Sequence, residues 1–121
     1  MKLILLIAAA AIGVATAAGA DPLAATYGNT VTQTLPDGTK AIVYINADKT
    51  WEQHVTDEVV KGTYAWKDDT HVCFTVTDPA PQDPSTATSC IEIKGERNVG
   101  DSWTEAIGDG KAITISITAG R

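Results

Sequence analysis

The stretch HVCFTVTDPAPQDPSTATSCIEI, residues 71–93, contains both cysteines of the chain and decides how the fold is interpreted. Apolar and polar side chains alternate over 71–77 and again over 86–93, and this period of two is typical of half-buried β-strands. The intervening segment, 78–84, carries three prolines, which cannot extend a ladder of backbone hydrogen bonds. The pattern therefore predicts a hairpin of two strands joined by a proline-rich loop.

The two cysteines test this prediction. The alternation places Cys73 and Cys90 on the face opposite the apolar side chains of their strands. A register that pairs the cysteines also pairs apolar side chains, Val72 with Ile91 and Val76 with Ala87. We therefore predict a structural disulfide, which is the default in an oxidising compartment. A metal-binding or reactive thiol pair is the alternative, but such a site typically has C-x-x-C spacing or nearby histidine ligands.

Turn signals recur at short intervals along the rest of the chain, at 36–38, 46–49, 67–69 and 108–110. Between them, and including the two strands above, lie eight candidate strands: 30–35, 40–45, 50–56, 60–66, 71–77, 86–93, 102–107 and 112–118. Regular turns between strands are typical of all-β folds. We predict an antiparallel up-and-down meander that closes into a small eight-stranded barrel, with a β-sandwich as the alternative.

The first 20 residues predict a signal peptide. Lys2 precedes an apolar run, and small residues lead to two possible cleavage points, after Ala17 or after Ala20. We favour the second, which divides the chain into a signal peptide, 1–20, and a single β-barrel domain, 21–121. A membrane anchor is the alternative, but the second half of the run is diluted by alanine and glycine. The expected product is exported, periplasmic or secreted, with no membrane span after cleavage.

The chain is acidic, with a formal net charge of −6 that becomes −7 when Lys2 is removed. An acidic surface without clustered lysine and arginine repels phosphate backbones and anionic membranes. We expect no nucleic-acid partner and a monomeric product.

Several short runs together carry a family resemblance: residues 45–51 (INADKTW), 62–66 (GTYAW), 72–74 (VCF), Cys90 and 99–103 (VGDSW). The chain resembles a group of small exported alphaproteobacterial proteins that lack an assigned function. In general shape it is similar to calycin-like barrels of the lipocalin and avidin type. The lipocalin G-x-W motif lies on the first strand, whereas Gly62 and Trp66 lie mid-chain and too far apart, so the resemblance transfers no ligand-binding residue.

Catalytic and metal-binding patterns are sparse. His54 shares a strand face with Glu52, and this is the only acid–base pair that the sequence suggests, while His71 is most simply a turn residue. The alternating oxygen-bearing side chains of 46–52 resemble part of a calcium loop, but strands flank them and the glycine of such a loop is missing. We predict no catalytic residues, no metal and no cofactor.

Aromatic side chains offer a possible ligand site. Trp51, Tyr64, Trp66 and Trp103 either line a cavity for a small apolar ligand or fill the interior of the barrel. Of these two interpretations, we favour core filling.

The function that we expect is a non-enzymatic envelope binding module for a protein or polymer, with an inhibitor-like role as one form of it. Recognition concentrates on loops held by a rigid scaffold, so the predicted interaction loop is 78–84, with a second surface at 94–101. Its candidate contact residues are Asp78, Pro79, Pro81, Asp83 and Pro84. A periplasmic carrier of a small apolar ligand in the barrel interior is the alternative, and an enzyme is a distant third.

Overall fold

A computed structural model describes residues 21–93 and 95–121. The predicted signal peptide, 1–20, lies outside the described residues. Within them, no helix has the length and apolar character needed to span a membrane.

The described chain contains eight strands and two short 3₁₀ helices, so the predicted all-β class is confirmed. The strands are β1 (Thr30–Thr34), β2 (Lys40–Ile45), β3 (Thr50–Val55), β4 (Glu58–Trp66), β5 (His71–Asp78), β6 (Thr88–Glu92), β7 (Ser102–Gly108) and β8 (Lys111–Thr118). The 3₁₀ helices are η1 (Ala24–Thr26) and η2 (Pro84–Thr86). Two strands start two residues away from their predicted positions: β4 begins earlier, at Glu58, and β6 begins later, at Thr88, because η2 extends to Thr86.

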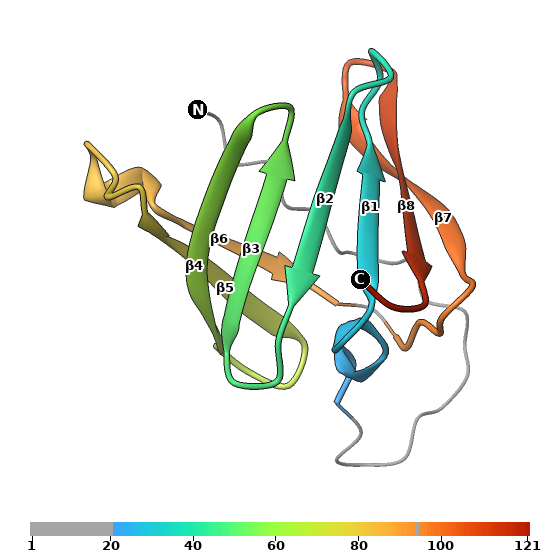
Figure 1. The fold of residues 1–121 in the computed structure, drawn as a ribbon, viewed down its shortest axis with the longest axis horizontal. Helices are drawn as coiled ribbons and strands as arrows, with labels where there is room; N and C mark the ends of the chain where they lie inside the picture. The colour runs from blue at the N-terminus through green and yellow to red at the C-terminus, as the bar shows by residue number, and fades with distance from the viewer. Residues whose placement is uncertain (1–20, 94) are drawn as a thin grey trace.

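The strands form one antiparallel meander in the order β6-β5-β4-β3-β2-β1-β8-β7. Pairing of β1 with β8 joins the first strand to the last, and the sheet curls into a half-barrel (Figure 1). The meander is therefore confirmed. The ring expected of a closed barrel is incomplete among the described strands, because β6 and β7 are the two ends of the sheet order. Residues 93–101 separate these two strands in the chain, more than the two to five residues of a usual hairpin turn.

The concave face of the sheet holds the core, as the alternation of apolar residues predicts. In β8, Ile113, Ile115 and Ile117 are buried, and β1 and β2 contribute Val31 and Val43 from the same side. Period-two burial along each strand is what one-sided packing of a sheet requires.

One end of the interior is filled by aromatic rings. The Trp51 ring packs edge-on against Phe74, with 6.1 Å between centroids, and Tyr64 lies 5.5 Å from the same ring. Trp51 pairs across the β3–β4 ladder with Gly62. A Cβ atom on Gly62 would lie 1.9 Å from the carbonyl oxygen of Thr75 and 2.8 Å from the Trp51 ring. Glycine is therefore required there, because any side chain would collide with the backbone of β5.

The predicted hairpin register is confirmed. Cys73 pairs with Cys90 and Val72 with Ile91, and the N–H of Val76 donates to the carbonyl of Ala87 at 2.9 Å. The cysteines form a disulfide between directly opposed residues, with 3.9 Å between their Cα atoms.

Replacement of both cysteines by serine should lower the free energy of unfolding by about 3 kcal/mol, because the disulfide limits the freedom of the unfolded chain. Urea unfolding measures the change, and the wild type under a reducing agent should give the same value as the double variant. Equal stability of the oxidised wild type and the variant would contradict a structural role.

The substitution Gly62→Ala should destabilise the fold by about 1–3 kcal/mol, because the added Cβ must displace the Trp51 ring or the β5 backbone. Thr63→Ala is the matched control, since Thr63 is exposed on the other face of β4, and its effect should stay within about 0.5 kcal/mol. A Gly62→Ala variant as stable as the control would show that the contact is unimportant.

Candidate functional site

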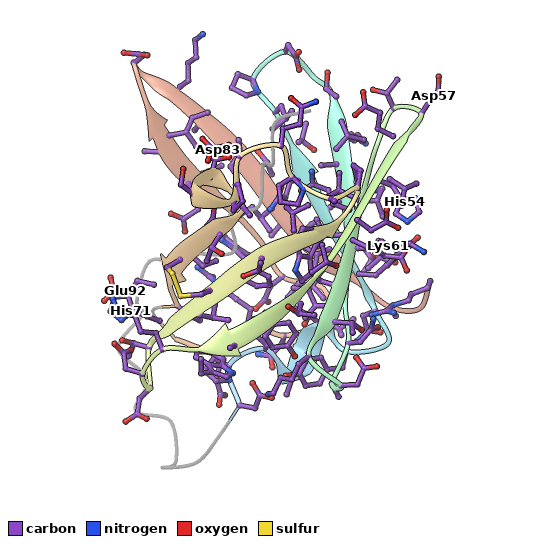
Figure 2. The ribbon with its side chains drawn as sticks, turned by 90° about the vertical axis from the view of Figure 1, so that its left-hand side faces the viewer. His54, Asp57, Lys61, His71, Asp83 and Glu92 are labelled. Atoms are coloured by element: carbon purple, nitrogen blue, oxygen red, sulfur yellow. A yellow bond between two sulfur atoms is a disulfide. The ribbon has the colours of Figure 1, made fainter. Side chains whose placement is uncertain are left out.

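A surface cavity of about 470 Å³ lies beneath the proline-rich loop, where β4 and β5 reach the same end of the sheet. Its lining comes from one strand residue on β4, one on β5 and the loop itself: Val60, Val76, Pro79, Ala80, Pro81, Gln82, Asp83, Thr86 and Ala87. Figure 2 shows Asp83 on this loop, away from His71 and Glu92 at the other end of the β5–β6 hairpin. The volume falls in the range of about 300–1,000 Å³ that is usual for ligand pockets.

The loop is held in one shape by its own hydrogen bonds. The carboxylate of Asp83 accepts from the N–H and the hydroxyl of Ser85, at 3.0 and 2.7 Å, and so caps η2. These bonds lower the pKa of Asp83 below its ordinary value, and the bond from the Ser85 hydroxyl has the larger effect. The Ala87 N–H donates to the carbonyl of Pro84 at 3.2 Å, while each proline ring fixes its own φ angle. The walls of the cavity are therefore preformed.

The five predicted contact residues of the interaction loop divide into two groups. Pro79, Pro81 and Asp83 line the cavity, whereas Asp78 ends β5 and Pro84 begins η2 without contributing to the lining.

The aromatic residues predicted as a ligand set do not line this cavity. Trp51 and Tyr64 are buried at the aromatic end, where the indole N–H of Trp51 donates to the carbonyl of Thr63 at 2.9 Å. The hydroxyl of Tyr64 donates to the carbonyl of Asn46 at 2.7 Å, and burial raises the pKa of Tyr64. Both rings pack against the ring of Phe74.

The other two members of that set lie elsewhere. Trp66 is half-buried at the end of β4 and packs against the edge of the core. Trp103 is on β7, where the guanidinium of Arg97 lies 4.2 Å from the centre of its ring. Trp51 and Tyr64 thus pack on the same ring, while Trp66 and Trp103 each pack elsewhere.

Sequence reasoning missed Gln53, whose side chain is fully buried between Trp51 and Val55 on the inward face of β3. Gln53 is the direct cross-strand partner of Val60, which lines the cavity. The signal was present in the sequence, because a glutamine interrupts the apolar side of an otherwise regular strand pattern.

The two histidines lie on exposed surface, each next to a carboxylate. His54 Nε2 is 2.8 Å from Glu52 Oε2, so the predicted neighbours do meet, and the Tyr44 ring packs edge-on against His54 at 5.5 Å. Both partners of this pair are about one-third exposed, at 38% and 33%. The pair lies on the outer face of β3, on the opposite side of the sheet from Gln53.

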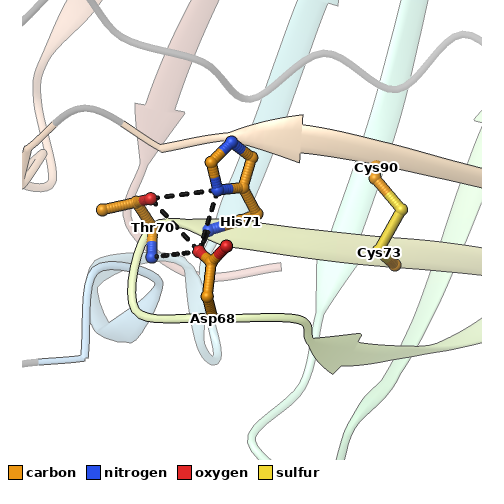
Figure 3. Close-up of polar contacts among 5 residues, drawn as sticks. All are labelled: Asp68, Thr70, His71, Cys73 and Cys90. Carbon is orange, nitrogen blue, oxygen red and sulfur yellow. Dashed lines mark hydrogen bonds and ion pairs between the residues drawn. A yellow bond between two sulfur atoms is a disulfide. The ribbon is translucent and has the colours of Figure 1, made fainter.

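His71 is the first residue of β5 and borders the turn that follows β4, shown with the nearby disulfide in Figure 3. Asp68 Oδ1 accepts from the backbone N–H groups of Thr70 and His71 at 2.9 and 2.8 Å, and it lies 2.8 Å from His71 Nδ1. The bond from the Thr70 N–H, followed by the His71 side chain, lowers the pKa of Asp68. The cluster is a turn stabilised by one carboxylate.

The same turn chemistry occurs at three other connections. Asp37, Asp48 and Asp83 each accept the N–H of the threonine or serine two residues later, at 2.8, 3.1 and 3.0 Å. Their pKa values are lowered by hydrogen bonds with that threonine or serine. The repeated D-x-T/S pattern is readable in the sequence, and it explains the 46–52 run as a hairpin turn.

Over residues 21–93 and 95–121, no group of three or more His, Cys, Asp and Glu side chains is arranged to hold a metal ion.

No protein-family model, curated protein or solved structure matched this chain in three comparisons. The resemblance to small exported proteins and to calycin-like barrels therefore stays a prediction.

The fold should lose stability in acid. Asp68 and the three other turn aspartates have a folded pKa below the ordinary value of 3.8, so their contribution is present above about pH 4 and is lost as pH falls through the folded pKa. The urea midpoint should therefore drop between pH 5 and pH 2. Asp68→Asn should weaken this dependence because it removes one titrating group. Asp69→Asn, which leaves the hydrogen bonds of Asp68 in place, should retain the wild-type dependence. An unchanged midpoint over this interval in the wild type would contradict the argument.

Proposed function

We propose that the mature protein is an exported, non-enzymatic binding module, and that its binding site is the cavity beneath the proline-rich loop. The observation that carries this proposal is the preformed cavity of about 470 Å³ at the predicted interaction loop. Its interior wall is apolar, with Val60 and Val76 on the strands and Ala87 directly after η2, and Asp83 and Gln82 at the rim can fix the orientation of a partner.

The exposure of the lining favours a protein partner. Pro79, Ala80, Gln82 and Asp83 line the cavity and are also exposed on the molecular surface. A site for a free small molecule normally buries most of its ligand. A cavity with so exposed a rim instead suits one inserted side chain whose parent protein covers the loop, as anchor residues do at protein interfaces. The acidic charge of the chain, −6, favours a partner with a basic surface around that anchor.

The placement of the titratable groups supports a non-enzymatic role. Each histidine meets its carboxylate on exposed surface, His54 on the outer face of β3 and His71 at the other end of β5 from the loop. General acid–base chemistry needs such groups within reach of a bound substrate, and neither histidine lines the cavity.

The disulfide supports export, since such bonds persist mainly in oxidising compartments. It also serves the proposed site directly, because it fixes β5 to β6 and these two strands carry the ends of the loop.

A carrier of a small apolar ligand is the second candidate, and the volume of the cavity favours it. Native mass spectrometry of the protein purified from its host separates the two. A reproducible added mass of small-molecule size would support a carrier, and a bound polypeptide would support the interaction module.

Filling the cavity should abolish partner binding. Ala80→Trp places a large ring at an exposed lining position, whereas Ala47→Trp adds the same ring at the turn between β2 and β3, at the opposite end of the sheet. After cross-linking in the host envelope fraction, the wild type and Ala47→Trp should recover the same partner and Ala80→Trp should lose at least about nine-tenths of it, which corresponds to a tenfold weaker affinity. Equal recovery with all three proteins would place the binding site elsewhere.

A further inference from the structure

The cavity beneath the proline-rich loop has a single charged residue in its lining, Asp83, while the other lining residues are apolar or neutral. The Oδ1 atom of Asp83 is used within the loop, where it accepts from the N–H and the hydroxyl of Ser85. The Oδ2 atom accepts a hydrogen bond from none of the described residues, and none of their lysine, arginine or histidine side chains forms an ion pair with it. One carboxylate oxygen of the cavity is therefore available to a partner.

The Asp83 carboxylate carries its charge at neutral pH. The hydrogen bonds from Ser85, with that of the hydroxyl as the stronger influence, hold the pKa of Asp83 below its ordinary value. The same bonds fix the orientation of the carboxylate, because Oδ1 is tied to the first turn of η2. The cavity thus presents a fixed negative charge at its rim.

The surroundings of this charge are acidic as well. Over 56–58 and 78–84, all of the charged residues are carboxylates: Asp57, Glu58, Asp78 and Asp83. Both stretches lie at the end of the sheet where β4 begins and β5 ends. Lys61 lies opposite Asp78 in the β4–β5 ladder and is exposed, and Figure 2 shows it well apart from Asp83. The local charge therefore favours a cationic group in the cavity.

The walls of the cavity add apolar contact to this charge. Val60 and Val76 lie on the strand side, and Pro79 and Pro81 lie on the loop. A long basic side chain buries its methylene stem along apolar surface and keeps its charged head hydrated. Because Asp83 is exposed, a cation beside it keeps part of its hydration and avoids the large cost of a buried charge.

We propose that the partner anchors itself in this cavity through an arginine side chain, whose stem packs on Val60 and Val76 and whose guanidinium donates to Asp83 Oδ2. This inference rests on the proposed function and specifies its ligand. Arginine is favoured over lysine because its planar guanidinium is weakly hydrated and has N–H groups for two acceptors at once. The amide oxygen of Gln82, the neighbouring residue of the lining, offers the second acceptor.

The first test uses two probes of similar length that differ in charge, butylguanidinium and butylurea. In NMR titrations of the protein purified from its host at low ionic strength, butylguanidinium should bind about fivefold more tightly, as expected for one exposed ion pair. The preference should decrease with added salt. The amide signals of 79–87 should shift, and those of 46–49 should not. Equal affinity of the two probes, or shifts confined to other residues, would overturn the inference.

Two matched substitutions locate the charge that is responsible. Asp83→Asn removes the charge and keeps a side-chain oxygen for the cap of η2, because asparagine caps helices as well as aspartate does. It should abolish the preference for butylguanidinium. Asp78→Asn removes the same charge from a loop residue that does not line the cavity, and it should retain most of the preference. Asp83→Ser, another good cap, repeats the measurement in case asparagine disturbs the loop. A preference that survives in both Asp83 variants would overturn the inference.

A third probe, pentylammonium, separates arginine from lysine. It should bind more weakly than butylguanidinium, because an ammonium group is a strongly hydrated point charge. Tighter binding of pentylammonium would overturn the choice of arginine.

The outcomes separate this inference from the proposed function. Loss of partner capture in Ala80→Trp, together with no preference for butylguanidinium, would overturn the role of Asp83 and leave the binding site in place. A preference that Asp83→Asn abolishes, together with partner capture that Ala80→Trp does not affect, would refute the protein partner and assign the site at Asp83 to a free organic cation. If both proposals hold, Asp83→Asn should recover about fivefold less partner than Asp78→Asn.

Discussion

The pairing of β1 with β8 is the constraint on which the rest of the structure depends. It sets Val31 opposite Ile117 and Gln33 opposite Ile115, and so it turns a linear meander into a sheet with an inside. A slip of one residue would turn the isoleucines of β8 toward solvent, because side chains alternate between the two faces. The C-terminal residues strengthen this closure, since the N–H of Gly120 donates to Asn29 Oδ1 at 3.0 Å.

The interior that results is not uniform along its length. At one end, the rings of Trp51, Tyr64 and Phe74 fill the space. Gly62 allows the Trp51 ring and the β5 backbone to lie close to β4 there. The register shift in the β4–β5 ladder, between Lys61 and Gly62, lies beside the cavity, because Val76, which lines the cavity, pairs with Gly62. Bulges of this kind are over-represented beside functional sites because they change the course of one strand against its neighbour. The well-packed end can therefore stabilise the fold, while the other end carries the cavity that we propose as the binding site.

The disulfide stabilises the two strands that flank the proline-rich loop. Among the described strands, β6 pairs with β5 alone, so backbone hydrogen bonds of the sheet hold β6 along a single edge. The bond between Cys73 and Cys90 adds a covalent link across that ladder, between the two strands that lead into and out of the loop segment. A loop whose ends and internal turn are fixed loses little conformational freedom on binding, which is the general advantage of a preorganised site.

How much could be predicted from the sequence differs between the fold and the site, and the reason is the range of the interactions involved. The order and faces of the strands, the pairing of Cys73 with Cys90 and the position of the proline-rich loop follow from the sequence itself. Each depends on alternation, turn residues or one hairpin, which are local properties of the chain. The tertiary structure alone decided three features. These are the missing pairing between β6 and β7 among the described strands, the packing of Trp51 and Tyr64 against Phe74, and the cavity lined by Val60. The same holds for Gln53, whose amide has no hydrogen-bond partner among the described residues: its pattern in β3 marks it as inward, but whether another side chain reaches its amide depends on the curl of the whole sheet.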